Sequence, residues 1–217
     1  MIKADLHVHT SYSVDGCMSP EEIVELSRAR GIGALAITDH NTIVGAHAVR
    51  KMAPFPIIAG EEVSTVQGEL LGLFLEEEVP RGLSARETVR LIKDQGGLVG
   101  VPHPFDRLRV ESLDGSVLSD IADQLDFIEG LNSRITFAAD NLRAQEFASR
   151  NGLPCTAGSD AHTAHELGRA HVELPALGGR HQFLEQLREG HMGGGLSPFW
   201  VHFFSIYARA RNKLRRE

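Results

Sequence analysis

The first ten residues of the chain bring together two histidines and an acid, and a second acid follows after a short loop. His7 and His9 are two positions apart, Asp5 precedes them, and Asp15 comes later. Side chains alternate between the two faces of a β-strand, so Asp5, His7 and His9 are predicted to point the same way. Two neighbouring imidazoles form half of a divalent-metal site, and a nearby acid can orient a ligand. The segment therefore predicts metal chemistry, with Asp5 in a supporting role.

Polar residues of the same kind follow five further segments that have the composition of buried strands. They are Asp39 and His40 after 33–38, Glu61 and Glu62 after 56–59, His103 after 97–101, Asn132 and Arg134 after 126–131, and Asp160 and His162 after 153–158. Functional groups of β/α barrels gather at the carboxyl ends of their strands. Six strand ends with metal-binding or phosphate-binding groups are more than a generally polar surface explains.

Eight of these residues are candidate metal ligands. They are His7, His9, Asp15, His40, one glutamate of the pair Glu61 and Glu62, His103, Asp160 and His162. A single tetrahedral site takes about four ligands, so this set predicts two or three divalent ions. The other histidines lack such surroundings and are assigned to the surface or to packing: His47, His165, His171, His181, His191 and His202.

Strand and helix patterns alternate along the chain. Capping signals at Ser19 and Ser84 predict helices over 20–30 and 84–95. Further helices are predicted over 41–52, 137–150 and 180–189, and strands over 2–9, 33–38, 56–59, 69–75, 97–101, 126–131, 153–158 and around Val172. Such alternation predicts a largely parallel sheet that is covered on both faces. We expect one α/β barrel domain in residues 1–192, a hinge at 193–195 and a basic helical tail in 193–217.

Composition narrows the class of protein further. The 217 residues are 42% hydrophobic and carry a net charge of −7, so general electrostatics does not favour nucleic acid as a partner. Cys17 and Cys155 are far apart, which predicts free thiols and a cytoplasmic location. No apolar run approaches the roughly 20 residues of a membrane span, and we expect no signal peptide.

Six motifs, in this order, resemble the PHP (polymerase and histidinol phosphatase) family: DLHVHTSYSVDG, ITDHNT, GEEVST, VPHP, GLNSR and GSDAHT. The resemblance covers about residues 1–175. It implies a distorted, TIM-barrel-like β/α barrel of seven strands. It also implies up to three divalent ions, of manganese, iron or zinc.

The resemblance also implies a role for each candidate ligand. One ion is expected on His7, His9, Glu62 and Asp160, a second on Glu62 and His103, and a third on Asp15, His40 and His162. The family pattern G-x-E-[VI]-[ST] selects Glu62 over Glu61 as the bridging residue. The chain departs from the family at Asn132, near which some members have a second histidine, so the second ion is expected to be held less well.

Two neighbouring ions can clamp a phosphate and activate a water molecule. No protein nucleophile of the G-x-S-x-G type is visible. We therefore predict a metal-dependent phosphoesterase, a hydrolase of phosphoric ester bonds, with Glu62, Asp160 and Arg134 as catalytic residues. Arg134 and Asn132 are expected to contact the substrate phosphate, and Arg107, Arg109 and Arg169 are weaker candidates. Small phosphorylated compounds are the expected substrates, among them nucleotides and short 5′-phosphorylated RNA or DNA.

Three alternatives compete with this interpretation. An amidohydrolase site often uses a carboxylated lysine, but none of the lysines ends a predicted strand: Lys3, Lys51, Lys93 and Lys213. The second alternative is a phosphatase of the histidinol-phosphate type, but such proteins are usually longer than this chain. A non-catalytic, metal-bound module that binds nucleotides or supports a partner is the third. For the tail after Ser197, packing on the barrel, a partner contact, and a membrane or nucleic-acid contact all stay open.

Overall fold

The computed structural model describes residues 1–201, and residues 202–217 lie outside the described part. A single sheet contains the nine strands of this part: β1 (Ile2–Val8), β2 (Ile32–Ile37), β3 (Ile57–Thr65), β4 (Gly68–Leu73), β5 (Leu98–Val101), β6 (Phe127–Asn132), β7 (Cys155–Gly158), β8 (Ala170–Leu174) and β9 (His191–Gly194). The helices are α1 (Pro20–Ala29), α2 (Val44–Arg50), α3 (Ala85–Asp94), α4 (Gly115–Asp120), α5 (Ala138–Arg150) and α6 (Arg180–Glu189), with a 3₁₀ turn at Ala122–Gln124.

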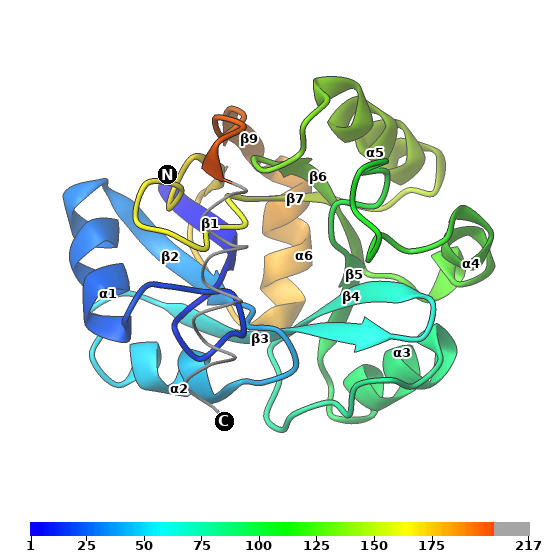
Figure 1. The fold of residues 1–217 in the computed structure, drawn as a ribbon, viewed down its shortest axis with the longest axis horizontal. Coiled ribbons are helices and arrows are strands. Elements are labelled where there is room, and N and C mark those ends of the chain that lie inside the picture. The colour runs from blue at the N-terminus through cyan, green and yellow to red at the C-terminus, as the bar shows by residue number, and fades with distance from the viewer. Residues whose placement is uncertain (202–217) are drawn as a thin grey trace.

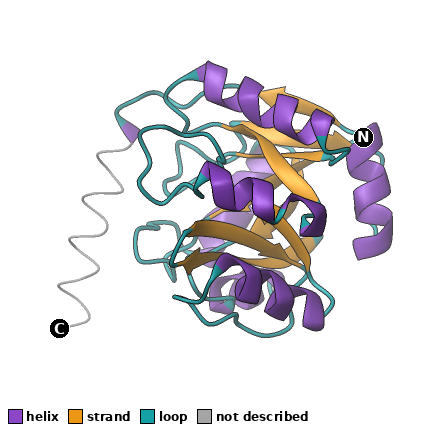
Figure 2. Ribbon diagram, turned by 90° about the vertical axis from the view of Figure 1, so that its right-hand side faces the viewer, coloured by secondary structure: helices purple, strands orange, loops and turns teal. Residues whose placement is uncertain are grey.

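The sheet curls until the β7 end comes back to β1, which confirms the predicted barrel. The strand order is β7-β6-β5-β4-β3-β2-β1-β8-β9. The segment after β7 lies beside β1, because the backbone N–H of Asp160 donates to the carbonyl of His7 (2.8 Å) and that of His9 donates to Ala161 (2.9 Å). Figure 1 shows α1 and α2 outside β1–β3 and α3, α4 and α5 outside β4–β7. Helices thus cover the outside of the barrel (Figure 2).

Two details of the predicted sheet are wrong. The described residues form nine strands rather than seven, and the sheet is mixed rather than largely parallel. Among its strand pairs, β1–β2, β2–β3, β5–β6 and β6–β7 are parallel, whereas β3–β4, β4–β5, β1–β8 and β8–β9 are antiparallel. The physical reason for the β3–β4 pair is a tight hairpin, in which Gly68 has a φ of +127° that favours glycine. No crossover helix separates these two strands, so they run in opposite directions.

Local chemistry explains where several of the helices begin. Ser19 caps α1 by accepting the N–H of Glu22, and Ser84 forms a complete capping box with Glu87 at α3. Helix α2 begins at Val44 rather than at 41, because Asn41 has a positive φ of 56° and its side chain pairs with Ser64. The short helix α4 was not predicted; Asp114 caps it by accepting the N–H of Ser116.

The interior of the barrel is apolar at one end. Helix α6 contributes Phe183 and Leu187, which pack with Leu6, Ala34 and Phe127 from the strands. In Figure 1 this helix lies behind the strands near the centre of the barrel. Because α6 fills the end where most strands begin, the opposite end is the one left for polar side chains.

The end of the described part differs from the predicted hinge. Gly193 and Gly194 belong to β9, which pairs with β8. Ser197 then donates its N–H to the carbonyl of Ser133 (2.6 Å), and Val201 is buried. The division into a barrel and a tail stays a prediction, and the tail beyond Val201 lies outside the described residues. Cys17 and Cys155 are free thiols, and none of the helices in residues 1–201 is long and apolar enough to cross a membrane.

Candidate metal centre

Four buried side chains converge at the carboxyl end of β1. The Nε2 atoms of His7 and His9 lie 3.1 Å apart. The Oε2 atom of Glu62 is 3.3 Å from each of them, and Oδ1 of Asp160 is 3.3 Å from Nε2 of His9 and 3.7 Å from that of His7. All four side chains are fully buried. The structure thus brings together the set that the sequence assigned to a first ion.

Glu62 stands at the centre of the wider cluster. Its Oε1 atom is 3.0 Å from Nε2 of His103, while Oε2 is 3.3 Å from Nδ1 of His40. Glu62 lies inside β3 rather than after it, just past the residues that pair with β2. The neighbouring Glu61 points elsewhere, since its Oε2 atom accepts the N–H of Val79 at 2.9 Å. Glu62 is therefore the glutamate that faces the histidines.

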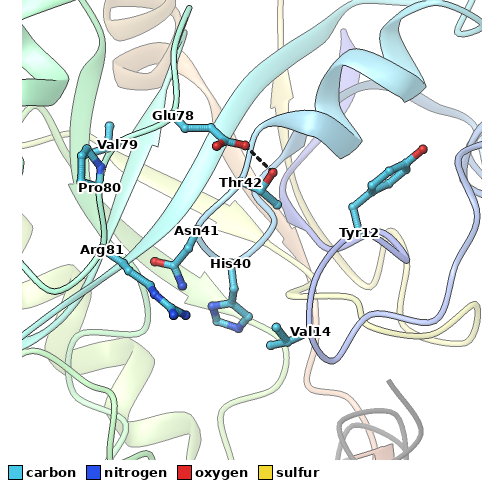
Figure 3. A pocket seen from close by; sticks show the side chains of 9 residues that line it. All are labelled: Tyr12, Val14, His40, Asn41, Thr42, Glu78, Val79, Pro80 and Arg81. Carbon is cyan, nitrogen blue, oxygen red and sulfur yellow. Dashed lines mark hydrogen bonds between the residues drawn. The ribbon is translucent and has the colours of Figure 1, made fainter. Parts of the chain in front are cut away.

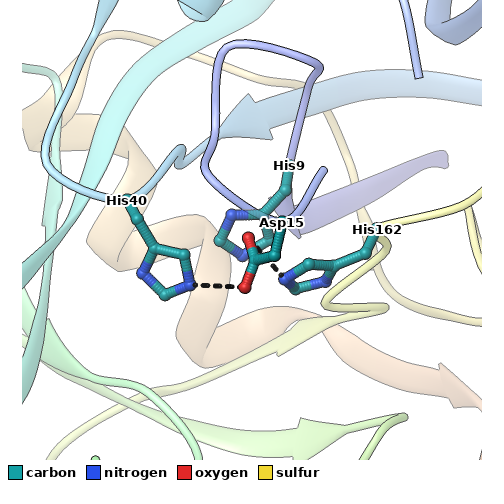
Figure 4. Close-up of side chains that lie close together, drawn as sticks. All are labelled: His9, Asp15, His40 and His162. Carbon is teal, nitrogen blue, oxygen red and sulfur yellow. Dashed lines mark ion pairs between the residues drawn. The ribbon is translucent and has the colours of Figure 1, made fainter. Parts of the chain in front are cut away.

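A second group of ligand atoms surrounds Asp15. Its Oδ1 atom is 3.2 Å from Nε2 of His162, and Oδ2 is 3.5 Å from Nε2 of His40. Figure 4 shows the carboxylate between the two rings, with His9 beside them. One ligand atom from each of these four residues lies within 4.8 Å of the others. This group shares His9 with the first set and holds the residues that the sequence assigned to a third ion.

The chemistry of these donors fits divalent ions. Donor atoms 3.0–3.7 Å apart match neighbouring ligands on an ion with bonds of roughly 2.1 Å. Glu129 lies 2.9 Å from Nδ1 of His7, and a proton on that nitrogen leaves the lone pair of Nε2 facing His9 and Glu62. Oδ1 of Asp160 is buried and has no hydrogen-bond partner among the described residues. Buried lone pairs that face one another are stabilised by a cation between them.

The electrostatics of the centre keep its carboxylates ionised. Burial raises the pKa of Glu62, but the nearby His40 and His7 outweigh it and hold this pKa well below its usual range. Burial also raises the pKa of Asp160, but the nearby Arg109 and His7 outweigh it, so this pKa lies well below normal as well. Burial lowers the pKa of His162 to about 3. Arg134 lowers this pKa further, whereas Asp15 raises it. Ionised carboxylates and neutral imidazoles are the forms that bind metals. Burial lowers the pKa values of His7 and His40, but the facing carboxylates outweigh it and hold them well above normal, so these two imidazoles must lose a proton when ions bind.

From the sequence, one supporting residue, Asp5, was given the wrong role, and another, Glu129, was missed. Asp5 does not orient an imidazole; its carboxylate accepts the N–H groups of Ser159 (2.8 Å) and Gly168 (2.8 Å). The alternation along β1 fails because its register shifts between Asp5 and Val8. Asp5 therefore fixes the loop that carries Asp160.

Glu129 takes the role that was expected of Asp5. Its Oε1 atom is 2.9 Å from Nδ1 of His7, and its Oε2 atom accepts the N–H of His103 (2.7 Å) and the amide of Asn132 (2.9 Å). A carboxylate on the far nitrogen of a ligand imidazole fixes its orientation and tautomer. The signal in the sequence was a single acid inside the otherwise apolar strand 127–131.

The expected phosphate-binding residues are engaged with protein groups. Arg134 is 4% exposed; its Nη1 atom is 2.6 Å from Nδ1 of His162 and its Nε atom 3.0 Å from Oε1 of Glu166. Asn132 donates from Nδ2 to Glu129 and Asp160, while its Oδ1 atom accepts the N–H of Arg134.

The three weaker arginine candidates differ in how near they come to the centre. Arg109 reaches it, with Nη2 2.6 Å from Oδ2 of Asp160. Arg107 pairs with Asp140, and Arg169 donates to the carbonyl of His165. Of the remaining histidines in the described part, none joins a metal-binding group. His165 packs its ring against Trp200, with ring centroids 5.9 Å apart.

An open cavity of about 570 Å³ adjoins the centre at His40. Tyr12 and Val14 line one side of it, and the segment from Glu78 to Arg81 lines the other (Figure 3). Glu78 accepts the hydroxyl of Thr42 at 2.6 Å. Arg81 is exposed, and it makes no hydrogen bond or ion pair to another described residue. The cavity gives the metal centre space for a bound molecule.

We predict that Gly158→Ala disturbs both stability and the centre. A Cβ at this position would lie 2.3 Å from Cβ of His7 and 2.8 Å from its backbone nitrogen, so β7 and β1 must separate. The free energy of unfolding in urea should fall by about 3 kcal/mol. Gly115→Ala is the matched control, because its Cβ would meet nothing within 4 Å. Equal stabilities of the two variants would show that this close approach does not matter.

The chain matches known families over most of the barrel. Residues 5–97 match the model for the PHP domain, and residues 138–192 match the model described as PHP-associated. An uncharacterized protein of Methanocaldococcus jannaschii is 34% identical over 179 residues, which cover 81% of this chain and 72% of the relative.

Two shorter matches are to proteins with named activities. A 5′-3′ exoribonuclease of Haemophilus influenzae is 29% identical over 119 residues, covering 48% of this chain and 43% of the relative. A phosphoribosyl 1,2-cyclic phosphate 1,2-diphosphodiesterase of Eggerthella lenta is 36% identical over 85 residues, covering 35% and 32%. This chain therefore spans less than half the length of either enzyme.

The fold itself recurs among solved structures. A two-domain protein from Bacteroides vulgatus, which contains a predicted PHP-like metal-dependent phosphoesterase, superposes with a TM-score of 0.74 at 18% identity. The match covers 89% of this chain but only 65% of the other, slightly less than two thirds of its length. This superposition shows the fold, and the matches of residues 5–97 and 138–192 together with the relative at 34% identity show that the chain belongs to the PHP domain family.

Proposed function

We propose that this protein uses two or three divalent ions, of manganese, iron or zinc, to hydrolyse small phosphorylated compounds, with nucleotides and short 5′-phosphorylated oligonucleotides as the favoured substrates. The observation that carries the proposal is the position of Glu62, whose two oxygens contact His103 on one side and His7, His9 and His40 on the other. Divalent ions at such a centre activate water and neutralise phosphate charge.

The residues of the chain divide the work by position. Glu62 and Asp160 would hold the ions, because each contacts at least two of the converging imidazoles. Arg109 and Arg134 lie beside ligand residues and already pair with Asp160 and Glu166, so they would favour a bound phosphate through their positive charge rather than through free hydrogen-bond donors. Asn132 is better suited to orienting Asp160 than to binding phosphate, because both ends of its amide are occupied.

The cavity at His40 supports a substrate with an organic part of nucleotide size. Its volume of about 570 Å³ lies in the range of small-molecule sites. Tyr12 offers an aromatic ring, and the exposed guanidinium of Arg81 suits a second phosphate or a carboxylate. The names of two relatives, an exoribonuclease and a cyclic-phosphate diphosphodiesterase, point to substrates of this kind.

We expect Arg81→Ala to weaken substrate binding without changing the chemical step. The loss of one hydrogen bond to a charged group should raise KM for a doubly phosphorylated nucleotide about tenfold and leave kcat nearly unchanged. The control is Arg90→Ala, because Arg90 pairs with Asp94 on an exposed face of α3. Steady-state kinetics on both variants decide the point. An unchanged KM in Arg81→Ala would exclude this cavity as the place of the second phosphate.

A substrate panel tests the proposal as a whole. The purified protein with Mn²⁺ should release phosphate, or mononucleotides, from at least one of three compounds: a nucleoside 5′-monophosphate, a 3′,5′-bisphosphonucleotide or a 5′-phosphorylated oligonucleotide. Histidinol phosphate belongs in the same panel, as the substrate of the competing phosphatase type. A chain that binds Mn²⁺ but hydrolyses none of these compounds would favour the non-catalytic, nucleotide-binding module.

A further inference from the structure

The loop of residues 102–114 joins β5 to α4 and reaches the metal centre. Near its end it pairs with β4, where Glu111 accepts the N–H of Glu69 at 2.9 Å. In residues 104–110, however, every backbone hydrogen bond between described residues stays within the loop, and Val110 is 93% exposed. Side chains rather than the backbone therefore place this part of the loop.

One of these side chains, that of Arg109, points inward. Its Nη2 atom donates to Oδ2 of Asp160 at 2.6 Å, and the side chain is only 16% exposed. The other carboxylate oxygen of Asp160, Oδ1, faces His7 and His9. Arg109 thus holds a positive charge one residue away from the first ion position, where it would attract the phosphate of a substrate.

A second arginine ties the same loop to helix α5. The Nε atom of Arg107 lies 3.2 Å from each carboxylate oxygen of Asp140, and its Nη2 atom donates to Oδ1. Its Cζ atom also lies 4.9 Å from the centroid of the Phe137 ring. Asp140 is fully buried, whereas the side chain of Arg107 is 52% exposed. A buried carboxylate needs a charged partner, and the guanidinium of Arg143 lies farther away, at 3.8 Å.

We propose that Arg107 is a positioning residue for the proposed phosphoesterase: its pair with Asp140 fixes the loop so that Arg109 stays beside Asp160 when a phosphate binds. Arg107 and Arg109 are two residues apart, so release of the first frees the second to leave the centre. The effect falls on phosphate affinity, because binding is favoured in the fraction of molecules that have the charge in place. The inference rests on the proposed function for its kinetic test, but the position of the loop is measurable without turnover.

Arg107→Ala should raise KM for the best substrate of the panel about five- to tenfold and leave kcat within about twofold of the parent. The dissociation constant of inorganic phosphate, measured by calorimetry on the Mn²⁺-loaded protein, should rise by the same factor. Arg107→Lys keeps a charge beside Asp140 and should recover most of the affinity. The matched control is Arg150→Ala, because Arg150 pairs with Glu146 on an exposed face of the same helix; it should bind phosphate like the parent.

A double variant separates positioning from general damage to the fold. Arg109→Ala should itself weaken phosphate binding, and adding Arg107→Ala should then have no further effect, because the residue that Arg107 positions is gone. In metal-free protein, Arg107→Ala should speed amide hydrogen exchange in residues 104–113 and leave the strands of the barrel unchanged. Should Arg107→Ala not fold with Asp140 unpaired, its combination with Asp140→Asn removes the buried charge and carries the same expectations.

Three results would overturn the inference. The first is phosphate binding by Arg107→Ala that is as tight as that of the parent. The second is an equal loss of affinity on Arg107→Ala in the parent and in Arg109→Ala, which would mean that the two arginines act independently. The third is unchanged hydrogen exchange of the loop in Arg107→Ala. Phosphate binding and hydrogen exchange require no turnover, so a parent that binds phosphate but hydrolyses nothing would fail the proposed function and not this inference.

Discussion

Replacement of Asp160 by asparagine is expected to lower kcat for phosphate release by about a thousandfold or more, because an ion with one ligand fewer loses several kcal/mol of transition-state stabilisation. Asp160 is fully buried and lies within 3.7 Å of both His7 and His9. Asparagine keeps the size of the side chain. Its main loss among contacts within the protein is the hydrogen bond that Asp160 accepts from Arg109. The measurement is kcat at saturating Mn²⁺, with bound metal counted in the same sample.

A control variant should behave like the parent. Asp120→Asn removes a carboxylate at the exposed end of α4 and should leave kcat and metal content unchanged. If Asp160→Asn retained the parent's kcat and its full complement of metal, Asp160 would not be a ligand and the proposed centre would be wrong. A folded Asp160→Asn protein without metal, from a parent that has no detectable activity, would instead support a structural metal.

Removal of metal is expected to lower the melting temperature by roughly 5–10 °C. Carboxylates of Asp15, Glu62 and Asp160 are buried in one cluster, and their mutual repulsion is relieved when cations bind. An ion at 100 times its dissociation constant adds about 2.7 kcal/mol, and each kcal/mol shifts the melting temperature of a chain of this size by about 2–4 °C. Differential scanning calorimetry before and after chelation, and again after Mn²⁺ is restored, measures the effect.

The same experiment contains its own control. In Asp160→Asn, added Mn²⁺ should raise the melting temperature less than it does in the parent, because one binding carboxylate is gone. A parent that melts at the same temperature with and without chelator would contradict binding of ions by the folded state alone.

The sequence predicted the barrel and its ligand end because both depend on local patterns. Alternating strands and helices and the capping residues Ser19 and Ser84 are visible in short windows. His9, His40 and His162 were likewise predicted to meet because each lies at or just after the end of a strand, and the structure brings them together.

The remaining features depend on register and on contacts between distant segments. The irregularity of β1 turns Asp5 toward Ser159, 154 residues away, and strict alternation does not predict it. Glu129 meets His7 across the barrel, and Glu69 meets His40 only because β4 forms a hairpin with β3. No short window of sequence contains these pairs, so their roles became visible only in three dimensions.

The most direct test of the account is a single titration of chelator-treated protein with Mn²⁺, in which phosphate release and bound ions per chain are measured together on the best substrate of the panel. We expect no release before Mn²⁺ is added, a rise as the second ion binds, and saturation at two or three ions per chain. Phosphate release that is independent of added Mn²⁺, or full binding of Mn²⁺ without release from any compound of the panel, would contradict it.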